Sequence, residues 1–264
     1  MRKWFREKLK PKAVVFVDYE HWYYSYLSKW GFKPNVSAWR KEIESKYRID
    51  YMEVFADFSK PSISEEKAYL ETIADRVYDT KDSNTYRNKD TTDFIMLDHI
   101  YRSAVKYKNI PNYVLFTGEG NFRSVVKFLT EHRKKVISYG VNGAYSGMLR
   151  AAATETILLP SEDEIYIHYR DFIIDNLAYC VDTGKIISTF SGTVEAVAKK
   201  HHLEGYPVKQ VLTRMLDEGY LYQRDHYYGI NKKTRKLAAD WERLIAEGLF
   251  VVHDSKATAP NGEE

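Results

Sequence analysis

Three acidic residues of the first 160 stand where a strand ends or a helix begins. Asp18 closes the run 13–18 (AVVFVD), Asp93 opens a helical pattern after a polar loop, and Glu119 follows the run 113–117 (YVLFT). If these side chains meet at one edge of a sheet, three carboxylates attract a hard divalent cation such as Mg²⁺ or Mn²⁺. Such an ion activates a water molecule and neutralises the charge that builds on a phosphate under attack.

Each of these acids also has an ordinary structural explanation. Asp18 could cap the helix that follows it, and Asp93 could be a first-turn acid favoured by the helix dipole. Glu119 could be solvated in its turn. Taken singly, the structural explanations are the better ones; taken jointly at one predicted edge, the three residues favour a site.

The turn around Glu119 has a phosphate-binding pattern. It reads Thr117-Gly118-Glu119-Gly120-Asn121 and leads into a helical segment. Glycine permits positive φ or close backbone approach, and amides at a helix start can hold a phosphate. We therefore predict that this turn contacts a substrate. The substrate-binding residues expected here and in adjacent segments are His21, Thr117, Gly118, Gly120, Arg87, Lys89 and Arg123.

Short β-rich runs alternate with helical patterns over the first 160 residues. The strands are expected at 13–18, 51–58, 76–80, 113–117, 135–139 and 156–159, and the helices at 22–47 with a break near 31–34, 64–75, 92–106, 122–132 and 148–153. Such alternation requires a parallel sheet covered by helices on both faces. Sheets of this kind bind ligands at the carboxyl ends of their strands, near the switch in strand order.

The rhythm changes after Pro160 and the acidic stretch 161–164. A long helix is expected at 165–181, two short ones at 193–201 and 208–217, an aromatic two-stranded ribbon within 220–230 and a closing helix at 232–247. This order suggests a winged helix. We accordingly divide the chain into a basic leader (1–11), an α/β domain (12–160), a winged-helix-like domain (161–250) and a flexible tail (251–264).

The formal charge differs between these parts. Residues 1–160 carry 27 basic against 20 acidic residues, a net charge of +7, whereas 161–264 carry 13 against 17, a net charge of −4. Attraction to nucleic acid is therefore expected mainly in the first part. The negative balance of the second part opposes a large nucleic-acid footprint there, so homo-oligomer formation or docking of a protein partner stands beside phosphate contact as its role.

Composition excludes several classes of protein. Hydrophobic residues make up 44% and charged residues 29%, which is typical of a globular chain. No apolar run approaches the ~20 residues of a membrane span, and no apolar segment follows the basic start as in a signal peptide. The single cysteine, Cys180, cannot form an intrachain disulfide, so a reducing, cytoplasmic setting is expected.

Four runs in order resemble the NYN domain, a LabA-like, PIN-related nuclease domain. They are VFVDYEHWY, KDTTDFIMLD, YVLFTGEGNFRSVVKFL and KKVISYGV, and the resemblance spans about residues 12–160. It implies a PIN-like three-layer α/β sandwich and a metal-dependent ribonuclease acting on RNA, with single strands the expected substrate. By the same resemblance Asp18, Asp93 and Glu119 match the acids of the family site, and Asp98 matches a further acid on the central helix.

The chain departs from the family pattern at three positions. His21 stands where asparagine is common, Glu119 is one methylene longer than the usual aspartate, and Asn121 stands where an acid is frequent. Histidine can ligate a softer metal or move protons, and asparagine can ligate through its carbonyl. Asp98 lies five residues after Asp93, about 140° around an ideal helix, so it is a secondary candidate.

Two hypotheses follow. The first is a metal-dependent endoribonuclease in which Asp18, Asp93 and Glu119 hold Mg²⁺ or Mn²⁺, with Asp98 and Asn121 as secondary ligands. The second, motivated by the three departures, is a non-catalytic RNA- or protein-binding module with a degenerate site.

Overall fold

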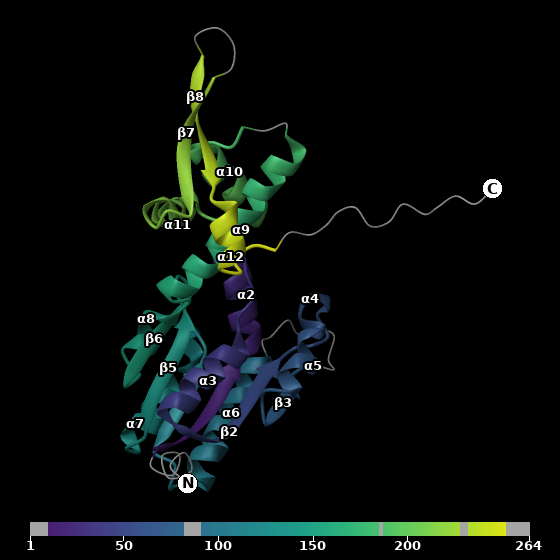
Figure 1. The fold of residues 1–264 in the computed structure, drawn as a ribbon. Helices are drawn as coiled ribbons and strands as arrows, with labels where there is room; N and C mark the ends of the chain where they lie inside the picture. Colours follow the sequence, from purple (N-terminus) through teal and green to yellow (C-terminus); the bar gives the residue numbers. More distant parts are fainter. Residues whose placement is uncertain (1–9, 82–90, 185–186, 228–231, 252–264) are drawn as a thin grey trace, which may run out of the picture. The chain divides into compact units, whose positions relative to one another are not determined.

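Six strands form one parallel sheet in the order β3-β2-β1-β4-β5-β6 (Figure 1). The strands are β1 (Lys12–Asp18), β2 (Arg48–Ala56), β3 (Arg76–Asp79), β4 (Asn112–Phe116), β5 (Lys135–Val141) and β6 (Glu155–Leu159). All five neighbouring pairs are parallel. The structure, a computed structural model, describes residues 10–81, 91–184, 187–227 and 232–251.

Continuous apolar runs make the central strands. Six successive residues of β1, from Ala13 to Asp18, are buried, and β4 is buried throughout. A strand covered by helices on both faces reads as such a run, because neither face meets water. The expected parallel α/β sandwich is therefore confirmed, with all six strands in their expected places.

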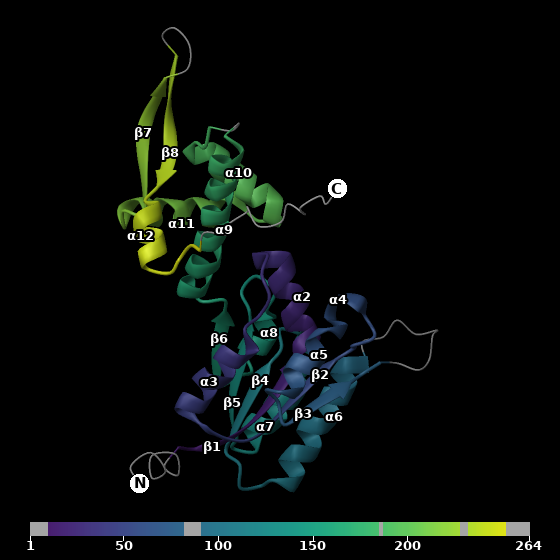
Figure 2. The ribbon, with the colours of Figure 1, turned by 45° about the vertical axis from the view of Figure 1, so that its right-hand side comes forward.

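Two helical layers cover the sheet (Figures 1 and 2). On one face, Trp22 of α2 (Tyr19–Trp30) stacks on Phe116 of β4 with 3.7 Å between ring centroids. Trp39 of α3 (Val36–Lys46) meets Tyr139 of β5 edge to face at 5.3 Å. This aromatic layer accounts for part of the high tyrosine and tryptophan content.

The other face holds the aliphatic core. Met96 and Ile100 of α6 (Thr91–Lys106) and Val125 and Leu129 of α7 (Arg123–Glu131) are fully buried in one cluster with side chains of β1 and β4. Short elements complete the unit: η1 (Gly120–Phe122), α8 (Gly147–Arg150), α4 (Pro61–Ser64) and α5 (Glu66–Glu71). The single helix expected at 64–75 is thus two short ones.

The strand order reverses beside β1. The chain runs outward from β1 to β2 and β3, then returns through α6 to place β4 on the other side of β1. Val17 and Phe116 pair near the ends of these two strands. The segments that follow diverge here, which leaves the opening at the sheet's carboxyl edge where ligands bind in such folds.

The chain divides into two compact units, which we call unit 1 (Met1–Ser161) and unit 2 (Glu162–Glu264). Unit 2 contains three helices, a two-stranded antiparallel ribbon and a short last helix. These are α9 (Glu162–Thr183), α10 (Phe190–His201), α11 (Gly205–Asp217), β7 (Leu221–Tyr227), β8 (Lys233–Ala239) and α12 (Trp241–Ala246).

The closing helix expected at 232–247 is wrong over its first half. Lys233–Ala239 is strand β8, paired antiparallel with β7. Leu237 and Ala239 alternate inward and are buried, as a strand on helices requires. Helix α12 begins only after Asp240, whose carboxylate accepts from the amide of Arg243 at 3.1 Å. The residue types of 233–239 favour a helix locally, but pairing with β7 makes this segment a strand.

A third extended segment reaches the base of this ribbon. The amide of Leu237 donates to the carbonyl oxygen of Ser188 at 2.8 Å, and the Ser188 hydroxyl donates to the carbonyl oxygen of Leu237 at 2.9 Å. Across the described parts of both units, no helix is long and apolar enough to cross a membrane.

Candidate active site at the carboxyl edge of the sheet

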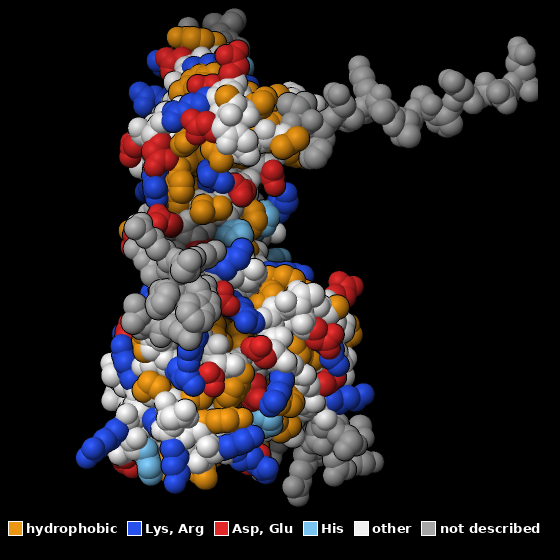
Figure 3. Space-filling model, turned by 60° about the horizontal axis from the view of Figure 1, so that its bottom comes forward, with side chains coloured by type: hydrophobic (Ala, Val, Ile, Leu, Met, Phe, Trp, Pro, Cys, Tyr) orange, Lys and Arg blue, Asp and Glu red, His pale blue; other side chains and the backbone are white. Residues whose placement is uncertain are grey.

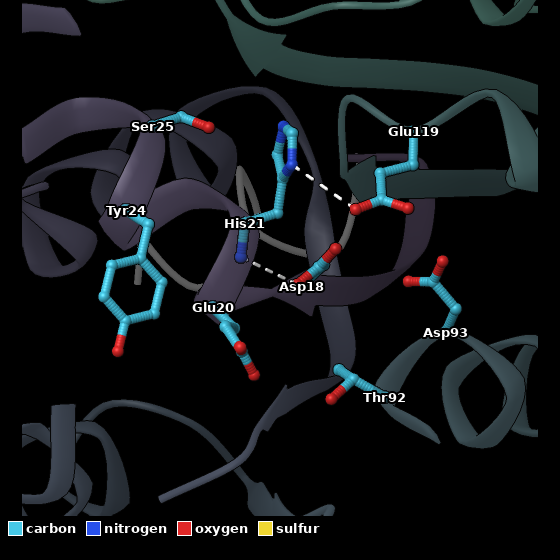
Figure 4. A pocket seen from close by; sticks show the side chains of 8 residues that line it. All are labelled: Asp18, Glu20, His21, Tyr24, Ser25, Thr92, Asp93 and Glu119. Atoms are coloured by element: carbon cyan, nitrogen blue, oxygen red, sulfur yellow. Dashed lines mark hydrogen bonds and ion pairs between the residues drawn. The ribbon is translucent and has the colours of Figure 1, made fainter. Parts of the chain in front are cut away.

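A pocket of about 170 Å³ opens at the carboxyl edge, where β1 and β4 end (Figure 4). Its lining comes from the first turns of α2, from the start of α6 and from the turn after β4. The lining residues are Asp18, Glu20, His21, Tyr24, Ser25, Thr92, Asp93 and Glu119. The strand-order switch thus brings together the three acids singled out in the sequence.

Asp18 caps helix α2 and also lines the pocket. It is the last residue of β1 and the N-cap of α2, where one carboxylate oxygen accepts from the amide of His21 at 3.0 Å. The side chain is only 3% exposed, and its other oxygen points into the pocket (Figure 4). The cap therefore fixes the carboxylate in place rather than competing with the site.

His21 completes a close group with Asp18 and Glu119. One ligand atom from each lies within 4.8 Å of the other two, and His21 Nδ1 is 3.7 Å from Glu119 Oε1. The second ring nitrogen, Nε2, lies 3.2 Å from the carbonyl oxygen of Ala144. If Nε2 carries the proton that this carbonyl accepts, Nδ1 presents a lone pair toward the carboxylate.

Gly118 makes room for this arrangement. A Cβ at Gly118 would lie 2.2 Å from the Ala144 oxygen and 2.3 Å from His21 Nε2. The Gly118 carbonyl also accepts from the amide of Ser146 at 2.8 Å, which ties the turn after β4 to the same loop. The glycine is needed here for close approach of the backbone.

Gly118→Ala is therefore expected to lower the melting temperature of the protein by several degrees. Overpacking costs ~1–3 kcal/mol, and each kcal/mol moves the melting temperature by ~2–4 °C in a domain of this size. Gly147→Ala is the matched control, because a Cβ at Gly147 has no neighbour within 4 Å. Thermal unfolding followed by circular dichroism measures both, and equal melting temperatures would contradict the assigned role of Gly118.

Asp93 faces Glu119 from the other side of the pocket. It lies in the first turn of α6, is 5% exposed, and accepts a hydrogen bond at Oδ2 from the side-chain amide of Asn121 at 3.3 Å. In Figure 4 its carboxyl group points toward that of Glu119. Asn121 therefore orients Asp93 through its nitrogen.

Crowded carboxylates set the electrostatics of the pocket. Burial raises the pKa of Asp18 to about 7, with further increases from the charges of Glu119 and Glu20 and a partial reduction from His21. Burial raises the pKa of Asp93 to about 8, helped by its hydrogen bond with Glu119 and by the Asp18 charge. The pocket therefore disfavours negative charge on Asp18 and Asp93, two of its four acids, when nothing neutralises it.

The pKa values of Glu119 and His21 shift in opposite directions, because each group stabilises the charged form of the other. A hydrogen bond from His21 lowers the pKa of Glu119 against the effect of burial. Burial lowers the pKa of His21, but Glu119 and Asp18 outweigh it, so the net shift is upward. The carboxylates of Glu119 and Asp18 therefore favour a positive charge on the neighbouring imidazole of His21.

Three of the other expected site residues lie between the end of β4 and the start of α7. Thr117 is fully buried, and its hydroxyl accepts from the amide of Glu119 at 3.3 Å, so it supports the turn from within. Gly120 begins η1 close to Ser146, and Arg123 is exposed at the start of α7.

The remaining expected residues are not part of the pocket as described. Asp98 is half exposed and pairs with Arg102 one turn further along α6, at 2.7 Å, away from the pocket lining. Arg87 and Lys89 lie outside the described residues, as do residues 1–9 of the basic leader and 252–264 of the tail.

The sequence reasoning missed four lining residues: Glu20, Tyr24, Ser25 and Thr92. Tyr24 and Ser25 lie three and four residues after His21, the spacing that places side chains on one helix face. That signal was available. Glu20 pairs with Lys60 and accepts from the amide of Asp57 at 3.2 Å, contacts between distant segments that the sequence does not indicate.

The donor set fits a divalent cation. Asp18, His21 and Glu119 offer two oxygens and one nitrogen at mutual distances that one ion can span. Burial raises the pKa of Asp18 by more than the charge and the backbone amide of His21 lower it, so its negative charge is only partly compensated. Bound cations supply that compensation in such sites, so the chemistry of the pocket matches what a cation would need.

Comparison with known proteins agrees with the fold. The sequence profile of a family described as "NYN domain" matches residues 12–160. A crystal structure of a protein of unknown function from Vibrio parahaemolyticus is similar, with a TM-score of 0.50 and 17% sequence identity; the match covers 58% of this chain and 94% of that one. No curated protein matches the chain.

Proposed function

The chain belongs to the NYN domain family, within the PIN-like nuclease superfamily, and from this premise we propose that it is a metal-dependent endoribonuclease. The observation that carries the proposal is the pocket at the strand-order switch. It gathers Asp18, Asp93 and Glu119 with His21, and it disfavours their combined negative charge. Such a site is arranged to gain from a cation.

Asp18, His21 and Glu119 would hold the ion, because their ligand atoms already lie within 4.8 Å of one another. When bound, Mn²⁺ or Mg²⁺ supplies a nucleophilic water and neutralises charge on the phosphate. The protein supplies the rest. Asp18 is fixed by the α2 cap, and Glu119 is fixed by the turn after β4. Asp93 contacts Glu119, and the side-chain amide of Asn121 donates a hydrogen bond to Asp93.

The exposed positions around the pocket would orient RNA. Arg123 lies four residues after Glu119 at an exposed helix start, where a phosphate oxygen is stabilised by charge and dipole together. Tyr24 lines the pocket, with its hydroxyl 2.7 Å from Ser62 Oγ and its ring 5.8 Å from Lys60 Nζ. An aromatic edge beside a cation suits a nucleobase next to its phosphate.

The direct test is an RNA cleavage assay on the full chain with Mn²⁺, Mg²⁺ or a chelator. Cleavage of varied single-stranded RNAs that requires the metal is expected. RNA binding that persists in chelator without any cleavage would instead identify a non-catalytic binding module, the alternative suggested by the residues at 21, 119 and 121.

The imidazole of His21 predicts a preference for Mn²⁺ over Mg²⁺, because nitrogen ligands suit the softer ion. The carbonyl oxygen of Ala144, next to Nε2, orients the ring in the way that hydrogen-bond acceptors orient metal-bound histidines. His21→Asn is expected to reduce Mn²⁺ affinity by at least about tenfold, a loss as large as those seen when a hydrogen-bond partner of a metal ligand is removed. The affinity for Mg²⁺ is expected to change less.

Calorimetry gives both affinities, and pulsed electron paramagnetic resonance of bound Mn²⁺ detects coupling to a ligating nitrogen in the wild type that His21→Asn removes. Ser25→Ala, which changes a lining residue outside the ligand group, is the control. Wild-type Mn²⁺ without nitrogen coupling would exclude His21 as a ligand.

A further inference from the structure

The ribbon of β7 and β8 concentrates positive charge within an acidic unit. Residues 221–227 and 232–239 contain five basic residues and one acid, a net charge of +4, whereas the rest of 161–264 carries eight basic and sixteen acidic residues, a net charge of −8. The overall −4 therefore conceals a strong local segregation. The basic members are Arg224, Lys232, Lys233, Arg235 and Lys236.

One face of the ribbon carries Arg224 and Lys236 without an acidic residue, whereas Lys233 and Arg235 lie on the other face with Asp225. Arg224 and Lys236 are directly opposite in the antiparallel register, and like charges in that position destabilise a ribbon. By strand alternation their face continues with Tyr222, His226 and Thr234, none of them acidic. In the described part of the chain neither Arg224 nor Lys236 forms an ion pair, whereas Asp225 on the opposite face pairs with Lys233 at 3.4 Å.

An exposed aromatic ring accompanies these cations. Tyr222, on the face of Arg224 and Lys236, is 47% exposed, whereas Tyr227, 70% exposed, lies on the opposite face with Asp225. The base of the ribbon is anchored on the helices by Leu221, Leu237 and Ala239, all buried, and both strands extend beyond the helices of their unit (Figures 1 and 2). Tyr222 follows Leu221 at this base but belongs to the other face of the ribbon, so its exposed ring is not part of the core.

The charge on the face of the molecule shown in Figure 3 is less segregated than on the ribbon. On the face of the molecule shown in Figure 3, lysine and arginine side chains lie among apolar and acidic ones rather than in one continuous patch. Unpaired cations beside exposed aromatic rings are what single-stranded nucleic acid requires, since phosphates meet the cations and unstacked bases meet the rings.

We infer that the face of the β7–β8 ribbon carrying Tyr222, Arg224 and Lys236 is a second binding surface for single-stranded RNA, separate from the pocket of unit 1. The inference rests on the proposed function for its choice of RNA. It gives unit 2 a role in substrate retention, and it replaces the expectation, drawn from the average charge, that unit 2 contributes little to RNA contact.

The test measures binding of a fluorescent 20-nucleotide oligo(U) to the full chain by anisotropy over a range of salt concentrations, in chelator so that no metal-dependent cleavage takes place. For Arg224→Ala/Lys236→Ala the log–log salt slope is expected to decrease in magnitude by about 1.4, two contacts at ~0.7 each. Lys199→Ala/Lys200→Ala is the matched control: it removes two exposed charges of α10 in the same unit.

Tyr222 tests the stacking separately. Tyr222→Ala is expected to weaken binding at least about fivefold, the lower end of what one lost base–ring contact costs, while Tyr222→Phe retains the wild-type affinity. Melting temperatures establish that the variants fold, and removal of the like-charge pair is expected to leave stability unchanged or higher.

Equal affinities and slopes for the ribbon variant and the α10 control would overturn the inference, as would a wild-type chain that binds no oligo(U). Neither result touches the proposed function, which is decided by metal-dependent cleavage. A ribbon variant that binds less RNA but still cleaves short RNAs at the wild-type rate would support both.

Discussion

Asp18→Asn is expected to reduce metal-dependent RNA cleavage at least about 100-fold. The substitution keeps the shape of the side chain and can keep the α2 cap, since an asparagine oxygen also accepts from the amide of residue 21. It removes one carboxylate from the group of Asp18, His21 and Glu119. A metal contributes several kcal/mol to such a reaction, and each 1.36 kcal/mol is a factor of about ten in rate.

The measurement is the rate of cleavage at saturating Mn²⁺, compared with Asp98→Asn as the control. Asp98 is also an aspartate of unit 1, in the middle of α6, but it is half exposed and paired with Arg102. Its substitution is expected to leave the rate within about twofold, because exposed pairs contribute little. If wild type and Asp18→Asn cleave equally well, the activity comes from a contaminating nuclease or from another site.

The metal-free protein is expected to lose stability as the pH rises from about 5 to 8.5. The pKa of Asp18 is raised from 3.8 to about 7, that of Asp93 to about 8, and that of His21 is raised as well. A group whose pKa is higher in the folded state stabilises it at low pH, and this contribution is lost as the pH rises through the folded pKa. The lowered pKa of Glu119 acts the other way only in more acid solution.

The expected size is on the order of a few kcal/mol, since one pKa unit corresponds to 1.36 kcal/mol. In a unit of this size that is a fall of roughly 5–10 °C in melting temperature. Mn²⁺ should restore stability strongly at pH 8.5 and weakly at pH 5, because at pH 5 it must displace protons. Thermal unfolding in chelator and in Mn²⁺ at several pH values gives the comparison.

Asp18→Asn provides the internal check on that cause. It removes a charge that burial disfavours, so the metal-free variant should gain stability over wild type progressively as the pH rises. Parallel curves for wild type and Asp18→Asn would show that Asp18 is not the group responsible.

These expectations describe a site in which stability is given up for binding. Burying Asp18 and Asp93 beside Glu119 is unfavourable for an isolated fold, and replacing the acids by neutral groups should stabilise it. Retention of the charges is understandable if the folded protein normally meets a cation. The proposed binding surface of unit 2 has the opposite charge but the same property: the like charges of Arg224 and Lys236 lower the stability of the ribbon until phosphate binds.

Local patterns in the sequence determined the architecture of unit 1. The run AVVFVD is too apolar for a strand with one wet face, and the alternation of six β-rich runs with helical patterns requires parallel pairing. Because both signals act within ten to twenty residues, they are visible in the sequence alone. The ends of strands placed Asp18 and Glu119 at the same edge for the same reason.

The secondary structure of unit 2 is harder to predict from the sequence, because its helix and strand patterns are short and mixed. The segment Lys233–Ala239 (KTRKLAA) is rich in residues that also favour helices. Its strand character comes from pairing with β7 and from the bond between Leu237 and Ser188. These are contacts made at a distance along the chain, and local propensity does not contain them.

The sequence by itself determined the sheet, the edge at which the pocket opens and three of the acids there, since residue type and spacing are enough to fix strands and their ends. Only the tertiary structure decided how those acids are used. Contacts across 123 residues, such as that of His21 with Ala144, turn a helix residue into a partner of Glu119. Distance, burial and the resulting pKa values are properties of side chains brought together from remote segments, and they exist only once the chain is folded.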